Sequence, residues 1–517
     1  YLNRNHSKPP RHFVPLLKTN LYTQIICKKY LYKHLIFSIL TCLFDTFFVS
    51  LSMINNCFTD IYAGLLPDKR LEKRVVKSMM DLLNLGTAVV NKASKAHSNK
   101  IGFYRMLSND SFSYNDLLEG SFRKCVESIN SSHVLAIQDT TEFNYNGLKG
   151  KLSKEDPDIG PTTLKAIPGY FCHPVLVVGA NSPSIFGLSS ALIYNRQWDQ
   201  KNKYERNYHD QPIEQKESYR WIEASEQTKE RIPPNVMITI IGDRENDIYE
   251  DFVRVPDNRT HILVRSRTDR MIANKGGKLY ATLENQAVQG RVLVEVSSSK
   301  NREKRSAELT LKFCPVTISA PADYKGDKKS VDLYAIEARE EEHTVPKGES
   351  PILWRLLTTH KVESFEDSLQ CVEWYKKRWL IEELFRVIKT KGFRIESSQL
   401  GSGQGLKKLL AITLEAALHV MRLKMALKKE TAEASEIFTP KQQQFLEVLQ
   451  KKVEGDTEKQ KNPYRKQSLA WAAWTLARLA GWSGYKSHGP PGYITIKEGY
   501  DYFNIQFEVY DMLVDDQ

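Results

Sequence analysis

Two apolar runs in this sequence each lead into an aspartate, and this repeated pattern constrains the fold more than any other feature. Residues 134–137 are Val-Leu-Ala-Ile and precede Asp139, and the largely apolar residues 236–241 precede Asp243. Short apolar runs of this length are typical of buried strands. Acidic residues at the ends of such strands indicate a site at the edge of an α/β sheet. We therefore predict a mixed α/β sheet with a functional site at one edge.

The remaining sequence patterns predict the elements around this sheet. Two strands joined by a turn are expected within 170–198, and a further strand at 260–265 ends in Arg265. Residues 271–349 consist of short alternating runs separated by Gly, Lys and Ser, which is typical of an all-β insertion. Apolar residues at helical spacing predict helices at 66–95, with Asp68 as the N-cap, and at 364–391, 403–429 and 468–482.

The expected helix at 364–391 carries a stripe of charged and aromatic residues. At about 100° per residue, five side chains fall within an arc of about 80°: Tyr375, Arg378, Glu382, Arg386 and Lys389. The opposite face is apolar and suits a buried core. An exposed amphipathic helix with ion pairs between residues four apart explains Glu382 beside its two arginines. It does not explain the two further acids at strand ends.

If the two strands belong to one sheet and this helix packs on it, three carboxylates converge, those of Asp139, Asp243 and Glu382. Unpaired carboxylates at close range repel one another. Divalent cations relieve this repulsion, and hard oxygen ligands suit Mg²⁺ or Mn²⁺. Two such ions can activate a water or a 3′-hydroxyl and stabilise the leaving oxygen in phosphodiester chemistry. The cations that flank Glu382 would then hold DNA phosphates.

The charge balance of the chain favours a polyanionic partner. Lys plus Arg number 74 against 62 Asp plus Glu, which gives a formal net charge of +12. Nucleic acid is the first expectation and an anionic membrane surface the second. The seven cysteines are scattered, and none forms a Cys-x-x-Cys pair. This pattern argues against a disulfide framework or a zinc ribbon and favours a reducing cytoplasm.

Residues 34–54 form a long apolar stretch preceded by lysines. By length and flanks this stretch could be a signal anchor or a membrane span. The chain opens on Tyr1 rather than on a methionine, and the globular pattern begins directly after Met53. We interpret residues 1–52 as a probable non-native upstream extension, with a hydrophobic anchor as the alternative.

Several of these motifs resemble one known family. The pattern Tyr375-x2-Arg378-x3-Glu382-x6-Lys389 resembles the Y-R-E-K signature of the IS-four family of bacterial DDE transposases, the Tn-five type. The segments "DREND" at 243–247 and "IQDTTEFNY" at 137–145 resemble the family's second and first aspartate motifs. Weaker similarities in the same order extend the resemblance over about residues 54–490, from "LPDKRLEKRVV" to "SLAWAAWTLARLAGW".

The resemblance implies an α/β fold with an RNase H-like mixed-sheet core, interrupted by an all-β insertion, and with helical N- and C-terminal domains. The expected division is an extension or anchor (1–52), an N-terminal helical DNA-binding domain (53–125), the first part of the catalytic core (126–270), the β-rich insertion (271–349), the second part of the core with the Glu helix (350–428), and a C-terminal helical dimerisation region (429–517).

The implied activity is cut-and-paste transposition of an insertion sequence at one Mg²⁺ site with two metals, Mn²⁺ being possible. An end is nicked, a hairpin is formed and resolved, and the 3′-end is transferred to target DNA. The implied partners are transposon-end DNA, target DNA and a second copy of the chain, a homodimer in the synaptic complex. No obligatory membrane and no small-molecule cofactor are implied, and the implied location is the bacterial cytoplasm, in association with the nucleoid.

The resemblance also assigns roles by position. Asp139, Asp243 and Glu382 would form the catalytic, metal-binding triad. The DNA-binding side chains would be Tyr375, Arg378, Lys389 and Arg386 near the cleaved end, Arg265 beside the site, and Trp354 stacked on a base flipped from the hairpin.

Each assignment has a simpler reading. Without the resemblance, Trp354 reads as core packing and Arg265 as an ordinary cation at a strand end. His173 is expected to be structural, and Glu383 points about 100° away from Glu382 on a helix. For the whole chain the alternatives are a nuclease that does not join strands, a catalytically silent transposase-derived DNA-binding protein or inhibitor, and a membrane-anchored protein.

Overall fold

The structure is a computed structural model that describes residues 61–93, 96–164, 167–199, 208, 210–273, 276–296, 305–389, 391–428 and 432–514. The chain divides into two units, one of residues 57–507 and one that combines residues 1–56 with 508–517. The predicted extension or anchor at 1–52 lies outside the described residues. None of the described helices is long and apolar enough to cross a bilayer.

Among the described residues, three helices precede the sheet, α2 (Lys69–Asn84), α3 (His97–Leu107) and α4 (Tyr114–Ser128). The predicted N-cap is confirmed, because the Asp68 carboxylate accepts hydrogen bonds from the amides of residues 70 and 71. Helix α2 ends well before the predicted end at 95. Gly86, just beyond its last turn, adopts a positive φ of 63°, a conformation that terminates helices and that glycine takes without steric cost.

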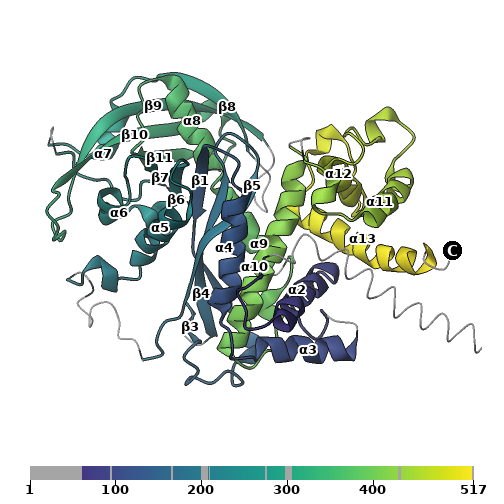
Figure 1. Cartoon of the computed structure of the whole chain (residues 1–517). Coiled ribbons are helices and arrows are strands. Elements are labelled where there is room, and N and C mark those ends of the chain that lie inside the picture. Colours follow the sequence, from purple (N-terminus) through teal and green to yellow (C-terminus); the bar gives the residue numbers. More distant parts are fainter. Residues whose placement is uncertain are drawn as a thin grey trace, which may run out of the picture. The chain divides into compact units, whose positions relative to one another are not determined.

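The strands form one mixed sheet in the order β2-β4-β1-β6-β7-β11-β10-β9-β8, and β3 and β5 pair with β4 (Figure 1). Strands β1, β6 and β7 run parallel to one another, and the other pairings are antiparallel. This mixed sheet with its helices is consistent with an RNase H-like transposase domain. The strands are β1 (His133–Gln138), β2 (Thr141–Asn144), β3 (Gly160–Pro161), β4 (Pro168–Gly179), β5 (Ile185–Tyr194), β6 (Met237–Gly242), β7 (Thr260–Arg265), β8 (Gly290–Val296), β9 (Arg305–Ser319), β10 (Ser330–Glu340) and β11 (Leu353–Thr358).

The helices that follow β5 cover the sheet and form the C-terminal part. The predicted helices at 403–429 and 468–482 are confirmed as α10 and α12. Helix α10 is buried along nearly its whole length, because α2, α4, α9, α12 and β5 all pack against it. The bounds are α5 (Tyr219–Arg231), α6 (Tyr249–Arg254), α7 (Leu279–Glu284), α8 (Phe365–Lys376), α9 (Trp379–Ile388), α10 (Gly403–Ala426), α11 (Pro440–Val453), α12 (Leu469–Leu479) and α13 (Tyr493–Val514).

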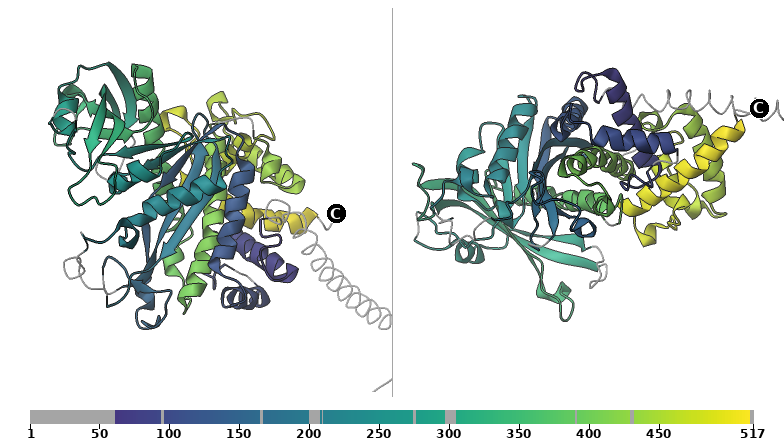
Figure 2. Two further views of the ribbon diagram at one scale, coloured as in Figure 1. Left: turned by 60° about the vertical axis from the view of Figure 1, so that its left-hand side comes forward. Right: turned by 90° about the horizontal axis from the view of Figure 1, so that it is seen from below.

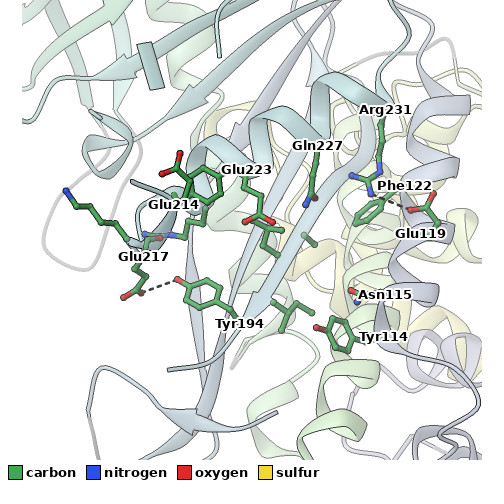
Figure 3. A pocket seen from close by; sticks show the side chains of 16 residues that line it. Tyr114, Asn115, Glu119, Phe122, Tyr194, Glu214, Glu217, Glu223, Gln227 and Arg231 are labelled. Atoms are coloured by element: carbon green, nitrogen blue, oxygen red, sulfur yellow. Dashed lines mark hydrogen bonds and ion pairs between the residues drawn. The ribbon is translucent and has the colours of Figure 1, made fainter. Parts of the chain in front are cut away.

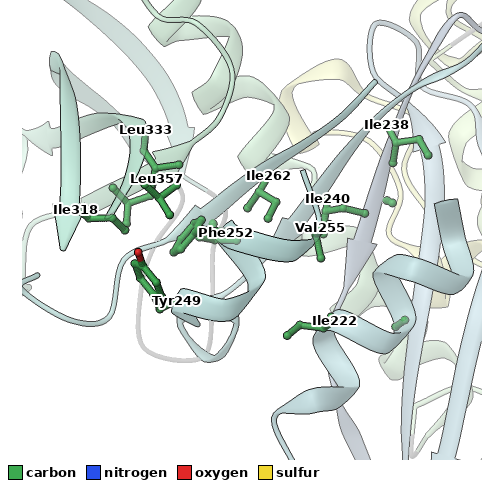
Figure 4. Packing of buried hydrophobic residues seen from close by; sticks show 14 of the residues in the cluster. Ile222, Ile238, Ile240, Tyr249, Phe252, Val255, Ile262, Ile318, Leu333 and Leu357 are labelled. Atoms are coloured by element: carbon green, nitrogen blue, oxygen red, sulfur yellow. The ribbon is translucent and has the colours of Figure 1, made fainter. Parts of the chain in front are cut away.

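One hydrophobic core runs along a single face of the sheet. Alternate residues of the parallel strands, such as Ile238 and Ile240 on β6, point into it, as expected for the two-residue period of a strand. Ile222 of α5 and Phe252 of α6 cover this face (Figure 4). Leu333 of β10 belongs to the same cluster. The core therefore extends without a break from the parallel strands to β9 and β10.

Residues 271–349 contain the strands β8 to β10 together with the short helix α7. The segment is thus not purely β. Strand β11 joins it to the parallel strands, because β11 pairs with β7 on one side and with β10 on the other. Figure 2 shows from two further directions that these strands continue the main sheet.

Candidate active site

The strand register brings the two predicted aspartates to the same edge of the sheet. Ile137 of β1 pairs with Ile241 of the parallel strand β6. Asp139 and Asp243, each two residues further on, therefore occupy equivalent positions beyond the carboxyl ends of neighbouring strands. On the next strand, Gly242 pairs with Val264, which places Arg265 beside Asp243 in the same row.

Backbone amides orient both aspartates. The Oδ1 atom of Asp139 accepts a hydrogen bond of 2.7 Å from the amide of Thr140. The Oδ1 atom of Asp243 accepts one of 2.7 Å from the amide of Glu245 and caps a short 3-10 turn. This turn is tight, since a Cβ atom at Gly242 would lie 2.4 Å from the Cβ atom of Asn246. Each carboxylate keeps its other oxygen for a further partner.

Glu382 reaches this edge from α9, but the predicted single helix at 364–391 is wrong. Helix α8 ends at Lys376 and α9 begins at Trp379. Between them the amides of Lys377 and Arg378 bond to carbonyls three residues back, at 3.0 and 2.9 Å, so the chain tightens as in a 3-10 turn. The Lys377 ammonium secures the break, because it donates to the backbone carbonyls of Gly179, Ala180 and Ser182.

Arg378 joins two of the three acids. Its Nη1 atom lies 3.3 Å from Oδ2 of Asp139, and its Nη2 atom lies 2.5 Å from Oε1 of Glu382. The three side chains are partly buried, with 16%, 19% and 31% of the Arg378, Asp139 and Glu382 side chains exposed. A single guanidinium thus bridges carboxylates that lie far apart in the sequence, one on the β1 edge and one on α9.

The three carboxylates outnumber this one bridging cation. The excess of negative charge is reflected in the raised pKa of Asp139. Burial, the neighbouring Asp243 and, more weakly, Glu382 raise that pKa to about 7, although the Thr140 amide and Arg378 act in the opposite direction. A group of hard oxygen donors with surplus negative charge has the chemistry that Mg²⁺ and Mn²⁺ prefer. The donor types therefore fit a divalent cation.

The arrangement of the donors does not yet form a metal centre. Within the part of the chain that the structure describes, no three His, Cys, Asp or Glu side chains are placed so that they could hold a metal ion. Arg378 supplies the positive charge that the acids would otherwise take from a cation. Metal binding by Asp139, Asp243 and Glu382 would require this guanidinium to release them.

Three of the predicted DNA-binding side chains gather beside the acids. The hydroxyl of Tyr375 interacts with the guanidinium groups of Arg265 and Arg378, and burial raises the pKa of that hydroxyl. Arg265 also donates a hydrogen bond of 2.8 Å to the carbonyl of Leu353. The ring of Trp354 meets that of Tyr375 edge to face, with centroids 5.7 Å apart. Trp354 is partly exposed, so part of its surface is available to a partner in addition to Tyr375.

The other two side chains of the predicted stripe lie apart from the acids. Lys389 stands beyond the end of α9, and its ammonium donates to the carbonyl of Glu142 on β2 at 2.6 Å. Arg386 is 47% exposed and pairs with Glu383 at 3.0 Å. The prediction that five side chains share one helix face is therefore wrong, because it assumed a continuous helix from Tyr375 to Lys389.

Two further polar residues near the site, Asp247 and His173, have structural partners. The carboxylate of Asp247, also in the loop after β6, is buried and binds the Arg270 guanidinium at 2.6 and 2.9 Å. His173 is buried, and its two ring nitrogens contact Thr140 and Gln138. Burial holds the pKa of His173 well below its usual range, so the ring is neutral.

Sequence reasoning missed Arg220, at the start of α5. Its side chain is 12% exposed and contacts the segments that follow both aspartates, through Thr140 and Glu245. Arg220 lies in the segment "KESYRW", and the family resemblance assigned this arginine no role. No pattern in the sequence alone indicates that one arginine spans these two loops.

A pocket of about 590 Å³ is lined by residues of α4, β5, α5 and the segment before α5, with Arg220 among them (Figure 3). Its walls mix both charges, for example Glu119 with Arg231, which pair at 3.6 Å. Asp139, Asp243 and Glu382 do not line it. The chemistry expected from the strand edge is therefore not located in this pocket.

The two aspartates thus follow neighbouring parallel strands, and Arg378 links the first of them to the glutamate on α9. Residues 217–418 match the family model of the transposase DDE domain. This range includes Asp243 and Glu382 and begins after Asp139. The match supports a DDE transposase.

Proposed function

We propose that this protein is a cut-and-paste DNA transposase of the IS-four, Tn-five type. The observation that carries the proposal is the guanidinium of Arg378, which bridges Asp139 beyond β1 and Glu382 on α9, with Asp243 at the equivalent position beyond the neighbouring strand β6. The family match covers two of the three acids. The raised pKa of Asp139, caused by burial and the nearby carboxylates, supports a site whose negative charge is balanced when a cation binds.

In this proposal the three acids supply the oxygen ligands, and the two strand-end loops fix two of them. When bound, divalent cations would activate a water or a 3′-hydroxyl and stabilise the leaving oxygen. Arg378, released from Asp139 and Glu382, turns its guanidinium to a phosphate of the cleaved end, a geometry that suits its planar donors. Tyr375 and Arg265 lie next to it and extend the phosphate-binding surface.

Trp354 stands at the side of this surface. It contacts Tyr375 edge to face and is partly exposed. An aromatic ring beside phosphate-binding cations can stack on a base that has left the duplex. We assign it to the flipped base of the hairpin end. End nicking, hairpin formation, hairpin resolution and strand transfer to target DNA would then occur at one site.

The synaptic complex in this proposal contains two copies of the chain. Helix α13 carries apolar side chains that are at least half exposed at positions 502, 505, 509 and 512. Spacings of three and four residues place these side chains on one side of a helix, as in the seams of coiled coils. A second copy of α13 is the expected partner for this stripe. Gel filtration at several protein concentrations tests the dimer.

The direct test uses the terminal repeats of the insertion sequence that encodes the protein. The protein is incubated with duplexes that carry these repeats, with Mg²⁺ or with EDTA, and 3′-end nicks are mapped. Glu382→Ala is expected to bind the ends but to leave them uncut. Glu373→Ala is the matched control, because Glu373 is an exposed residue of α8 that pairs only with Lys376 among the contacts described. Normal cleavage by Glu382→Ala would refute the site.

The alternative is a catalytically silent transposase-derived DNA-binding protein or inhibitor. The specific observation that favours it is the Arg378 bridge, which leaves no ready metal centre among the described residues. The two proposals differ in the cleavage assay. Uncut ends with wild-type protein, under conditions in which the ends are bound, would favour the silent protein.

Substitution of Arg378 tests whether this residue contacts a phosphate or is a purely structural cation. Arg378→Ala is expected to weaken the hairpin steps and to lower the salt dependence of end binding by about one phosphate contact. Binding is measured over a range of KCl concentrations. An unchanged slope would count against the contact.

A further inference from the structure

Arg220 makes three hydrogen bonds to three separate segments. Its Nε atom donates to Oγ1 of Thr140 at 2.7 Å, and its Nη2 atom donates to Oε2 of Glu245 at 2.8 Å. Its Nη1 atom donates to the carbonyl of Glu217 at 2.7 Å, which ties the guanidinium to the segment that begins α5. The Arg220 side chain is 12% exposed, whereas the side chain of its partner Glu245 is 60% exposed.

Both side-chain partners stand next to a candidate catalytic acid. The amide of Thr140 donates to the carboxylate of Asp139, and the amide of Glu245 donates to the carboxylate of Asp243, each at 2.7 Å. One guanidinium therefore grips the two residues that orient the two aspartates. It crosses from the loop after β1 to the loop after β6 without touching either aspartate in any described contact.

A buried network holds the Thr140 end of this link. The hydroxyl of Thr140 lies 2.8 Å from Nδ1 of His173, and Nε2 of His173 lies 2.9 Å from Oε1 of Gln138. Because the Gln138 oxygen only accepts, His173 carries its proton on Nε2 and accepts at Nδ1. Thr140 thus donates to His173 and accepts from Arg220, and the amide of Gln138 donates in turn to Ser225 of α5 at 3.0 Å. Every role is assigned without conflict.

We propose that Arg220 is a positioning residue that ties the Asp139 and Asp243 loops together, so that both aspartates can serve the proposed divalent-cation site. The assignment rests on the proposed function. Outer hydrogen bonds of this kind orient metal ligands, and their loss typically lowers metal affinity about 10- to 100-fold. The link acts on metal binding rather than on contacts to DNA.

The test measures Mn²⁺ affinity of the full chain by electron paramagnetic resonance, and Mg²⁺ titrations of end cleavage accompany it. Arg220→Gln is expected to weaken Mn²⁺ binding about tenfold and to raise the Mg²⁺ concentration for half-maximal cleavage, with a smaller change in the rate at saturating Mg²⁺. The double variant Arg220→Gln/Glu245→Gln is expected to bind Mn²⁺ no more weakly than Arg220→Gln, since the two residues act as a unit.

Arg196→Gln is the matched control. Arg196 also binds a carboxylate near the start of α5, that of Glu217, at 2.8 Å, and its described contacts do not include Thr140 or Glu245. Its replacement is expected to leave Mn²⁺ affinity unchanged. Thr140→Val serves as a second test, since it removes the bond from Arg220 and the bond to His173 and keeps the side-chain shape. It is expected to weaken Mn²⁺ binding in the same direction, even if Arg220→Gln fails to fold.

The outcomes separate the two proposals. A wild-type protein that binds Mn²⁺ and cuts, together with Arg220→Gln and Thr140→Val variants of unchanged Mn²⁺ affinity, would overturn the assignment of Arg220 alone. A wild-type protein that neither binds Mn²⁺ nor cuts would overturn the proposed function and the assignment with it. Equal weakening by Arg196→Gln would also overturn the assignment, because the effect would then not depend on the link between the loops.

Discussion

Two clusters of carboxylates and cations in this molecule are built in opposite ways. In the first, the buried Glu415 of α10 lies 3.2 Å from the Lys124 ammonium and 3.2 Å from the Arg422 guanidinium, and it accepts a hydrogen bond from Ser121 at 3.0 Å. Burial alone would raise the pKa of Glu415, but these partners lower it to about 2. The single carboxylate of Glu415 is therefore fully satisfied by two cations and a hydroxyl donor.

In the second cluster, carboxylates outnumber the cation that bridges them. Arg378 alone bridges Asp139 and Glu382, Asp243 lies close by, and the pKa of Asp139 rises to about 7 through burial and its acidic neighbours. A satisfied buried ion cluster serves the fold, whereas a site with surplus like charge is typical of function. The comparison separates a structural cluster from a candidate catalytic one without reference to any relative.

The largest expected effect on stability is at the satisfied cluster. Glu415→Ala leaves Lys124 and Arg422 without their carboxylate, and loss of one partner of a buried pair costs about 3–5 kcal/mol. Chemical denaturation at pH 7 measures the free energy of unfolding. A loss below about 1 kcal/mol would show that the cluster does not support the fold.

The same residue predicts a pH dependence. Because the pKa of Glu415 is lowered in the folded protein from 4.5 to about 2, its stabilising contribution is fully present above pH 4.5 and is lost as the pH falls towards 2. The difference in unfolding free energy between wild type and Glu415→Gln should shrink over this window. A difference that stays constant down to pH 2 would contradict the assignment.

Metal addition should affect only the unsatisfied cluster. At a free Mn²⁺ concentration about 100 times the dissociation constant, ligand binding stabilises the folded state by about 2.7 kcal/mol. Wild type and Glu415→Gln should both gain this increment in thermal melts, and Glu382→Ala should gain much less. Equal gains in all three proteins would place the metal elsewhere.

Removal of surplus charge should stabilise the protein without metal. Asp139→Asn keeps the acceptor for the Thr140 amide and removes one of the mutually repelling charges. In EDTA at pH 8 we expect the free energy of unfolding to rise by about 1 kcal/mol, while end cleavage in Mg²⁺ is lost. Destabilisation comparable to that of Glu415→Ala would mean that the two clusters do not differ in kind.

The smallest effect is expected at the exposed end of α9. Arg386 pairs with Glu383 on the surface, with 47% of its side chain exposed, and such pairs contribute little to stability. Arg386→Ala should change the unfolding free energy by less than about 0.5 kcal/mol and weaken binding to specific and non-specific DNA alike. A larger loss for the specific end than for random DNA would assign it a role in recognition.

The strand edge was readable from the sequence, because an apolar run followed by Asp or Arg reports both the strand and its end. Asp139, Asp243 and Arg265 were placed this way, and the register of β1, β6 and β7 sets them side by side. The roles assigned to them stay predictions. Local sequence patterns predicted the type of each element and the residues at its end.

The connection between α8 and α9 was not readable, because residues 374–382 contain neither Gly nor Pro to mark a break. The break depends on Lys377 reaching carbonyls some two hundred positions earlier in the chain. Arg220 was missed for a similar reason, since its partners lie on two other loops. Long-range hydrogen bonds of this kind leave no periodic signal.

The central claim is that Asp139, Asp243 and Glu382 share bound cations, and iron-directed cleavage tests it most directly. Fe²⁺ replaces Mg²⁺ in the full-length protein, ascorbate and peroxide generate hydroxyl radicals at the bound ion, and the cut positions of the polypeptide are mapped. We expect backbone cuts next to positions 139, 243 and 382, suppressed by excess Mg²⁺ and absent in Glu382→Ala. Cuts confined to other segments, or an unchanged pattern in that variant, would contradict the account.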